Sequence, residues 1–198
     1  MKSKKSENKS KTSNKGNLYI ISGPSGVGKG AVVAEVMRRL PDIKLSVSAT
    51  TRAPRLGETE GVSYFFVSQQ KFEQMISRGE FLEYDRHFDN YYGTPSKYVY
   101  DMLDCGRDVI LEIDIAGAQE VKGKYPEAKL LFIMPPTMEE LEKRLVCRST
   151  ESAEQIKKRL QRVEEETALQ TRYDYVIVND TVEKAADSIT EIIKEMNK

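Results

Sequence analysis

Residues 18–30 read LYIISGPSGVGKG, and this stretch decides the fold that the sequence predicts. Its first part, residues 18–22, is a short apolar run of the kind that forms a buried strand. Its second part, residues 23–29, matches the pattern G-x-x-x-x-G-K, and a helix with an apolar face follows it to about Leu40. This order of strand, glycine-rich loop and helix is typical of a phosphate-binding loop, because glycines let successive backbone N–H groups point at phosphate oxygens.

The loop predicts the binding of a nucleotide through its phosphates. Lys29 is expected to reach the β- and γ-phosphates, while the N-terminus of the following helix adds its positive dipole. The residues that we expect to contact the phosphates are Gly23, Pro24, Ser25, Gly26, Val27, Gly28, Lys29 and Gly30.

The loop departs from the common pattern at the residue after the lysine. Ser or Thr usually stands there and contacts Mg²⁺ through its hydroxyl, whereas this chain has Gly30 and then Ala31. Either the metal ion is held by waters and the nucleotide phosphates, with Ser25 or Asp114 assisting, or the activity is weakened. Since Mg²⁺ commonly keeps several waters, we favour the first alternative. Glu112 and Asp114 end a predicted strand and could orient such waters, because ligands of a doubly wound sheet bind at the carboxyl ends of its strands.

Beyond the loop, short apolar runs alternate with helical patterns. Further strands are predicted at residues 44–48, 64–67, 108–114, 129–134 and 174–178. Helices are predicted after Ser68, from Thr94 and Pro95 to Gly106, after the capping boxes that begin at Thr137 and Ser152, and over residues 182–196. Apolar strands between helices indicate a parallel sheet with both faces covered, and residues 48–96 interrupt this alternation as an inserted lobe.

Composition narrows the class of protein. The chain has 198 residues, with 31 Lys and Arg against 31 Asp and Glu, so its formal net charge is zero, and a broad basic surface for nucleic acid is not indicated. No apolar run approaches the about 18 residues of a membrane span. The two cysteines, Cys105 and Cys147, form no CxxC pair, so neither a disulfide framework nor a zinc site is expected, and the cytoplasm is the simplest location.

The balanced charge hides an asymmetry. Residues 1–16 carry a net charge of +5, from six lysines and one glutamate, which leaves −5 on the rest of the chain. This segment is almost free of apolar residues, so we expect a disordered, solubilising tail, and it lacks the apolar stretch of a signal peptide.

Several motifs beyond the phosphate loop make the chain similar to the guanylate kinases. They are SVSATTRAPRLGE at 46–58, GVSYFFV at 61–67, FLEY at 81–84, NYYGTP at 90–95, ILEID-x-x-GA at 110–118, FIMPP at 132–136 and VIVND at 176–180. The resemblance runs from about Leu18 to the last helix. It implies an α/β P-loop kinase with three layers, in which a parallel central sheet carries an inserted GMP-binding lobe and a helical lid.

The resemblance implies ATP-dependent phosphorylation of GMP, and of dGMP, in purine nucleotide metabolism, by direct in-line transfer. Mg²⁺ would accompany ATP as the cofactor, and the partners would be the small nucleotides ATP and GMP. Neither a specific nucleic acid nor a membrane is implied as a partner, and the sequence indicates no particular oligomeric state.

The acceptor site follows from the same resemblance. Arg52 and Arg55 lie three residues apart, which suits a guanidinium clamp on the phosphate of GMP, and Tyr64 and Tyr92 would add phenolic donors. Glu83 matches the carboxylate that accepts from N1 and N2 of guanine. The remaining guanine contacts are implied for Ser48, Thr94 and Asp114.

The resemblance also assigns arginines of the lid to the ATP phosphates and the transferring group. Arg144 and Arg148 lie four residues apart on one predicted helix and Arg159 lies on the next, although an exposed helix without function would carry the same pattern. Asn179 is a candidate neighbour of the adenine. The implied catalytic residues are Lys29, Arg52, Arg144, Arg148 and Arg159.

The implied division of the chain is a tail at 1–16 and a guanylate-kinase-like domain at 17–196. Its parts are a core at 17–46, 97–138 and 171–196, a GMP-binding lobe at 47–96, and a lid at about 139–170. Two other functions remain open: a scaffold domain that keeps the fold and binds peptides in the acceptor lobe, and a P-loop kinase with another acceptor. The intact phosphate loop argues against the scaffold.

Overall fold

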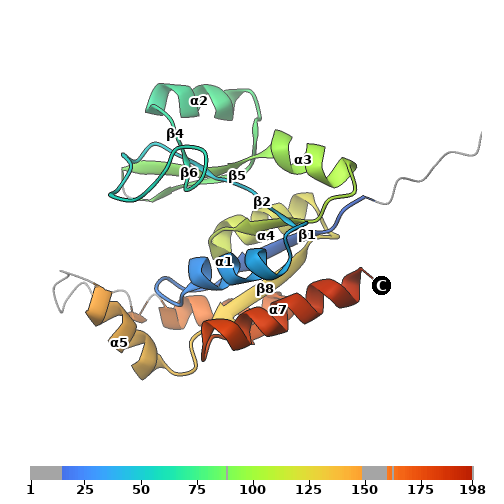
Figure 1. The fold of residues 1–198 in the computed structure, drawn as a ribbon. Coiled ribbons are helices and arrows are strands. Elements are labelled where there is room, and N and C mark those ends of the chain that lie inside the picture. The colour runs from blue at the N-terminus through green and yellow to red at the C-terminus, as the bar shows by residue number, and fades with distance from the viewer. Residues whose placement is uncertain (1–14, 88, 149–159, 162, 198) are drawn as a thin grey trace, which may run out of the picture.

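The computed structural model describes residues 15–87, 89–148, 160, 161 and 163–197. Within these ranges the chain forms one large and one small sheet, which Figure 1 shows as separate layers. None of the helices in the described ranges is long and apolar enough to cross a membrane.

The larger sheet has five strands in the order β2-β7-β1-β8-β9. Its strands are β2 (Lys44–Leu45), β7 (Val109–Glu112), β1 (Leu18–Ser22), β8 (Lys129–Met134) and β9 (Tyr175–Val178). Every pairing between neighbouring strands is parallel, so their carboxyl ends meet at one edge of the sheet.

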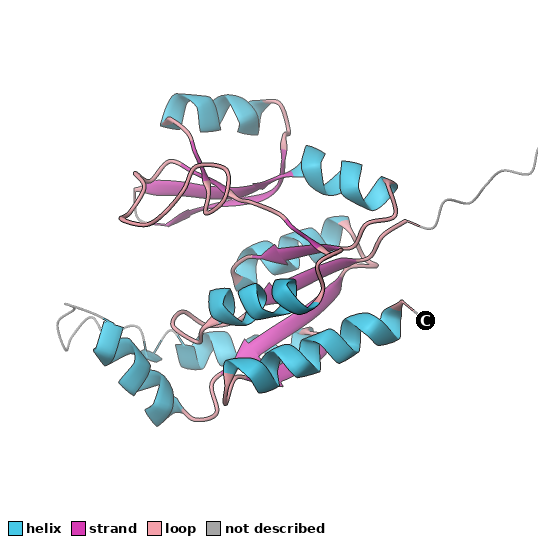
Figure 2. Ribbon diagram, viewed as in Figure 1, coloured by secondary structure: helices cyan, strands magenta, loops and turns pink. Residues whose placement is uncertain are grey.

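Helices cover both faces of this sheet, as Figure 2 shows. The helices α1 (Lys29–Arg39) and α7 (Val182–Met196) pack on one face, and α3 (Ser96–Asp104) and α4 (Ile115–Lys124) cover the other. Successive side chains of β1 lie on opposite faces of the sheet: Tyr19 packs with α1 and α7, and Ile20 packs with α3 and α4. The predicted three-layer fold with a parallel central sheet is confirmed.

The smaller sheet has four strands in the order β4-β3-β6-β5. Its strands are β4 (Phe65–Phe66), β3 (Ala49–Thr50), β6 (Asn90–Pro95) and β5 (Phe81–His87). Helix α2 (Gln69–Ser77) covers its outer face, where Phe72 stacks on Phe81 and Tyr91 with ring centroids 4.4 and 5.1 Å apart. Ser68 caps α2 as predicted, because its side chain accepts a hydrogen bond from the Lys71 backbone N–H.

The chain leaves β8 into α5 (Met138–Arg148), and Thr137 caps this helix by accepting from the Glu140 backbone N–H at 3.1 Å. Residues 160, 161 and 163–167 are helical, and the 3-10 helix η1 (Ala168–Arg172) leads into β9. The helix start predicted at Ser152 lies outside the described residues.

The single strand predicted over residues 44–48 is wrong. Strand β2 ends at Leu45 and pairs with β7, whereas β3 begins at Ala49 and pairs with β4 and β6. The chain therefore crosses from one sheet to the other within a stretch whose strand-forming pattern looks continuous. The sequence analysis also did not predict β5 and β6, which pair as an antiparallel hairpin.

The helix start predicted at Thr94 and Pro95 is also wrong. Both residues end β6, and α3 begins at Ser96 without a side-chain cap. The Thr94 hydroxyl instead donates to Glu83 Oε1 across the hairpin, at 2.5 Å. A tertiary partner has replaced the local capping role that the sequence suggested.

Candidate nucleotide-binding site

The phosphate loop joins β1 to α1 at the carboxyl edge of the central sheet, and its backbone requires glycine at two points. A Cβ on Gly23 would lie 2.1 Å from the Ile133 carbonyl oxygen, so β8 leaves no room for a side chain there. Gly28 precedes α1 in the left-handed conformation, with φ of 94°. The absence of a side chain at Gly23 and the left-handed backbone of Gly28 therefore allow the loop to pack against β8.

Lys29 begins α1 and turns back into this loop. Its Nζ donates to the Gly23 carbonyl at 2.6 Å and to the Pro24 carbonyl at 3.1 Å. Burial lowers the pKa of the Lys29 ammonium, while the Glu112 carboxylate acts in the opposite direction. A partly buried cation framed by the loop is well suited to a phosphate anion, since charges attract more strongly where water is excluded.

Asn179 lies behind the loop. It is only 3% exposed, its Nδ2 donates to the Val27 carbonyl at 2.7 Å, and its backbone N–H donates to the Met134 carbonyl at 2.8 Å. Arg144 Nη1 donates to the Asn179 carbonyl at 3.2 Å, and Arg144 Nε donates to Glu140 at 3.1 Å. Asn179 thus joins the phosphate loop to β8 and α5.

A cavity of about 540 Å³ opens between the loop and the smaller sheet. Of the predicted residues, its lining includes Gly23, Ser25, Lys29, Ser48, Arg55, Tyr64, Glu83, Tyr92, Glu112 and Asp114. Donor and acceptor residues predicted from separate motifs therefore lie around one space. Asn179 and Arg144 are outside this lining, while Arg159 and the side chain of Arg148 lie outside the described part of the structure.

Arg52 lies beside this cavity in a cluster of aromatic rings and one carboxylate. Its guanidinium carbon is 5.5 Å from the centre of the Tyr64 ring, and Tyr64 meets Tyr92 edge to face with centroids 6.1 Å apart. Glu58 binds the same guanidinium through two oxygens, at 3.0 Å from Nη1 and 2.8 Å from Nη2. The two-pronged contact is the geometry in which an arginine binds a phosphate.

Glu58 also accepts from the Arg55 backbone N–H at 2.7 Å. One carboxylate therefore binds both the Arg52 side chain and the Arg55 backbone, and it stabilises the loop that carries these two arginines. Its hydrogen bonds raise the pKa of Arg52, and Arg52 in turn lowers the pKa of Glu58. Sequence reasoning missed Glu58, although it ends the motif at 46–58 that carries both arginines.

Glu83 is the buried carboxylate of the cavity, with 5% of its surface exposed. A β-bulge between Phe81 and Glu83 lets Leu82 pack under α4 and Glu83 line the cavity, while Phe81 packs on α2. Burial raises the pKa of Glu83 to about 7, and the hydrogen bond from Thr94 opposes that rise. Thr94 therefore reaches the site through Glu83.

Glu112 ends β7 and Asp114 follows two residues later, and both line the cavity together with Lys29. Asp114 Oδ1 accepts from the Gly117 backbone N–H at 2.8 Å and caps α4. Burial raises the pKa of Glu112, and Lys29 counteracts this rise. A Cβ on Gly30 would lie 3.5 Å from Glu112 Oε1, which is an ordinary contact distance, so this carboxylate lies beside the first turn of α1.

Two further lining residues, which the sequence did not single out, come from the stretch at about 139–170 for which the resemblance implies a lid. Val163 and Glu166 reach it from the helical residues 163–167. Their helix carries no motif that marks the cavity side, so only the packing of this helix identifies them. Among the described residues, no three His, Cys, Asp or Glu side chains form a group that could hold a metal ion.

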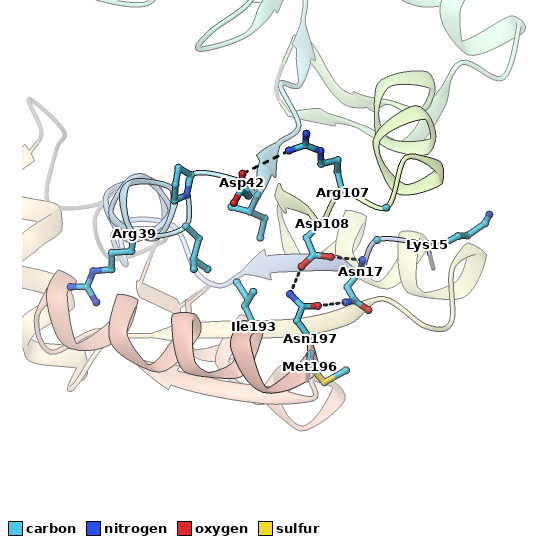
Figure 3. Close-up of a pocket in the computed structure, with 14 residues that line it drawn as sticks. Lys15, Asn17, Arg39, Asp42, Arg107, Asp108, Ile193, Met196 and Asn197 are labelled. Carbon is cyan, nitrogen blue, oxygen red and sulfur yellow. Dashed lines mark hydrogen bonds and ion pairs between the residues drawn. The ribbon is translucent and has the colours of Figure 1, made fainter. Parts of the chain in front are cut away.

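A second cavity, of about 860 Å³, lies at the opposite, amino edge of the central sheet (Figure 3). There Asp108 accepts from the Asn17 backbone N–H at 2.7 Å and from Asn197 Nδ2 at 2.6 Å, and Asn17 Nδ2 donates to Asn197 Oδ1 at 2.7 Å. These groups bind one another and tie the end of α7 to the start of β1. The larger cavity is therefore not the candidate nucleotide site. The smaller cavity is the candidate, because the phosphate loop lines it.

Comparison with known proteins agrees with this geometry. The family model described as guanylate kinase matches residues 15–196. The chain is 49% identical over 185 residues to a guanylate kinase of Clostridioides difficile, covering 93% of this chain and 90% of that protein. It is 50% identical over 184 residues to a guanylate kinase of Streptococcus agalactiae, covering 92% of this chain and 88% of that protein.

A solved structure extends the similarity to three dimensions. The crystal structure of guanylate kinase from Anaplasma phagocytophilum superposes with a TM-score of 0.77 at 36% identity, covering 92% of this chain and 87% of that chain. Sequence and fold thus agree over nearly the whole length, and the chain belongs to the guanylate kinase family.

Proposed function

We propose that this chain transfers the γ-phosphoryl group of ATP to a phosphate oxygen of GMP, or of dGMP, by direct in-line displacement. The observation that carries this proposal is the single cavity lined by Lys29 of the phosphate loop on one side and by Arg55 and Glu83 on the other. A phosphate donor and a guanine nucleotide acceptor bound there would meet within one enclosure. The products are ADP and GDP, or ADP and dGDP.

The transfer needs no covalent intermediate and no strong general base, because the attacking phosphate oxygen of GMP is already anionic. Catalysis then consists of positioning the two nucleotides and neutralising charge on the transferring group. Lys29 would supply partly buried positive charge at the donor phosphates. Arg144, Arg148 and Arg159 would add charge from the proposed lid, at about residues 139–170.

The acceptor side binds GMP at both of its ends. Arg52 and Arg55 would hold the GMP phosphate, with the hydroxyls of Tyr64 and Tyr92 as further donors. For Arg52, the Glu58 carboxylate now occupies the contact that a phosphate would make, which supports this role. We accordingly assign residues 47–96 to the GMP-binding lobe.

Glu83 would read the guanine base by accepting from its N1 and N2 donors. Adenine lacks those donors, so AMP would leave a buried carboxylate unpaired, at a cost of about 1–3 kcal/mol or more. Thr94 supports this role because it binds Glu83 directly. Ser48 and Asp114 complete the proposed set of guanine contacts.

Mg²⁺ would fit the donor side of the cavity, because carboxylate oxygens are ligands that this ion prefers and Glu112 lines the cavity together with Lys29. Since Gly30 and Ala31 offer no hydroxyl, Glu112, Asp114 and Ser25 would hold the ion through waters. The ion would neutralise charge on the β- and γ-phosphate oxygens. The adenine of ATP would lie near Asn179, beyond the loop.

We place the reaction in the cytoplasm, since the exposed free thiol of Cys105 suits a reducing compartment. No membrane or nucleic acid takes part in the proposed reaction.

A coupled assay with Mg-ATP and a panel of GMP, dGMP, AMP, UMP and CMP tests the proposal. We expect turnover with GMP and dGMP and little with the other three. Turnover with a different acceptor would identify another P-loop kinase, and no turnover with any acceptor would favour a peptide-binding scaffold.

A further inference from the structure

The first turn of α4 passes directly beside the Glu83 carboxylate. A Cβ placed on Gly117 would lie 2.8 Å from Glu83 Oε2, 3.1 Å from its Cδ and 3.2 Å from its Cγ. The separation of 2.8 Å is closer than a methyl group and a carboxylate oxygen can approach, so any side chain at residue 117 must displace the carboxylate or the helix.

The helix is not free to move away. The Gly117 backbone N–H donates to Asp114 Oδ1 at 2.8 Å, which caps α4 at its first turn. Ile115 and Ala118 of the same turn are buried in the core beneath the central sheet. Moving the backbone at Gly117 would therefore disturb both the cap and the core.

The carboxylate has little room to move either. Glu83 is buried, and its Oε1 accepts from the Thr94 hydroxyl at 2.5 Å. Its backbone is held in the hairpin with β6, where a Cβ on Gly93 would already lie 3.0 Å from the Glu83 carbonyl oxygen. Displacing the carboxylate would change its hydrogen bond to Thr94 and its direction within the cavity.

We propose that Gly117 is a positioning residue for base recognition: the absence of a side chain there allows the Glu83 carboxylate to lie against α4 in the orientation that reads guanine. This inference rests on the proposed role of Glu83. It adds that the carboxylate is aimed by two neighbours, Thr94 through a hydrogen bond and Gly117 through the space that it leaves.

Replacing Gly117 by alanine tests the proposal with a single methyl group. For Gly117→Ala we expect KM for GMP to rise by roughly 10- to 100-fold, because the displaced carboxylate no longer meets both base donors. KM for ATP should stay as in the unmodified protein. The preference for GMP over IMP, which lacks the N2 amino group, should fall by about 10-fold.

The same helix offers a matched control. Gly123 also lies in α4, and a Cβ there meets nothing within 4 Å. Both substitutions replace glycine by alanine in the same helix, so the change in intrinsic helix propensity is the same for both. Gly123→Ala should therefore leave KM for GMP and the GMP to IMP preference unchanged.

A double variant isolates the contact between the two residues. Removal of the carboxylate in Glu83→Ala gives the methyl group room, so adding Gly117→Ala to it should cost no further GMP affinity in calorimetry. If Gly117→Ala alone does not fold, the double variant should recover the melting temperature of Glu83→Ala. An equal loss of affinity or stability in both backgrounds would overturn the proposal.

The outcomes also separate this inference from the proposed function. If Glu83→Gln leaves base preference unchanged, Glu83 does not read the base, and the proposed function loses its recognition residue. If Glu83→Gln changes base preference while Gly117→Ala behaves like the unmodified protein, the positioning role of Gly117 alone is wrong.

Discussion

The proposed donor and acceptor halves of the cavity are built in different ways. The proposed donor half is centred on one continuous stretch from β1 through the phosphate loop into α1, which backbone geometry shapes and Asn179 supports from behind. The acceptor half collects side chains from residues 48 to 94, on strands of which β3 and β4 are only two residues long. The donor half is thus a local feature of the chain, whereas the acceptor half exists only when distant segments are packed together.

The halves also treat their positive charge differently. Burial lowers the pKa of Lys29, whereas the Glu58 carboxylate raises the pKa of Arg52. Arg52 is thus paired with the Glu58 carboxylate, whereas Lys29 Nζ donates to two carbonyl groups of the phosphate loop. Variants in the two halves should therefore change different kinetic constants.

The largest effect is expected in the donor half, for Lys29→Ala. Loss of this partly buried cation should lower kcat by roughly 10²- to 10³-fold, because the charge on the transferring phosphoryl group loses its main protein partner. GMP binding in calorimetry should stay close to normal, since the acceptor half is intact. The exposed Lys97→Ala is the control, and a comparable loss of GMP binding in Lys29→Ala would contradict the division into halves.

In the acceptor half, Arg52→Ala should raise KM for GMP by roughly 100-fold, because a two-pronged phosphate contact is removed. KM for ATP should change little. Arg78→Ala, at the exposed end of α2, is the matched control and should alter neither constant. A parallel rise of both KM values in Arg52→Ala would show that the halves are not independent.

Base recognition should respond to Glu83→Gln, which keeps the size of the side chain and an oxygen for the Thr94 hydroxyl. The amide cannot accept from both guanine donors, so the preference for GMP over AMP should fall by about 10- to 100-fold. Competition assays with both nucleotides measure this ratio. An unchanged ratio would remove Glu83 from base recognition.

The pH dependence of GMP binding should follow the same carboxyl. Because burial raises the pKa of Glu83 to about 7, part of the ligand-free protein is protonated at neutral pH. Guanine donors need the carboxylate, so affinity should rise from pH 6 to pH 8, by about 10-fold. The Glu83→Gln variant is the control, because the GMP phosphate still titrates but the carboxyl is absent. If GMP affinity of this variant rises as steeply with pH as that of the unmodified protein, Glu83 does not cause the pH dependence.

The smallest effect is expected for Asn179→Ala, in the donor half. The buried Val27 carbonyl would lose its partner, so the free energy of unfolding should fall by about 1–3 kcal/mol. Because the phosphate loop is then less well held, KM for ATP should rise a few-fold while KM for GMP stays constant. Denaturant titration measures the free energy of unfolding, and steady-state kinetics measure the two KM values. A change confined to KM for GMP would contradict the role of Asn179 in holding the phosphate loop.

Elements with long, regular local patterns could be predicted from the sequence. The strands at residues 18–22 and 129–134 and the helix at residues 182–196 have the predicted bounds. The two strands are continuous apolar runs and the helix has one apolar face, so the surfaces that they bury can be read from neighbouring residues alone. The hairpin of β5 and β6 did not follow from such a pattern, because Glu83 and Asp85 line the cavity although their charges suggest a face exposed to solvent.

The sequence by itself determined the strand–loop–helix unit around Lys29 and the motifs that place the chain in its family, because these depend on residues adjacent in the chain. Only the tertiary structure decided that Thr94 serves Glu83 rather than a helix, that Glu58 holds Arg52, and that Gly117 makes room for a carboxylate. The contacts of Glu83 with Thr94 and Gly117 join different elements, and the contact of Glu58 with Arg52 depends on the fold of one loop, so the preferences of the single residues do not set these distances.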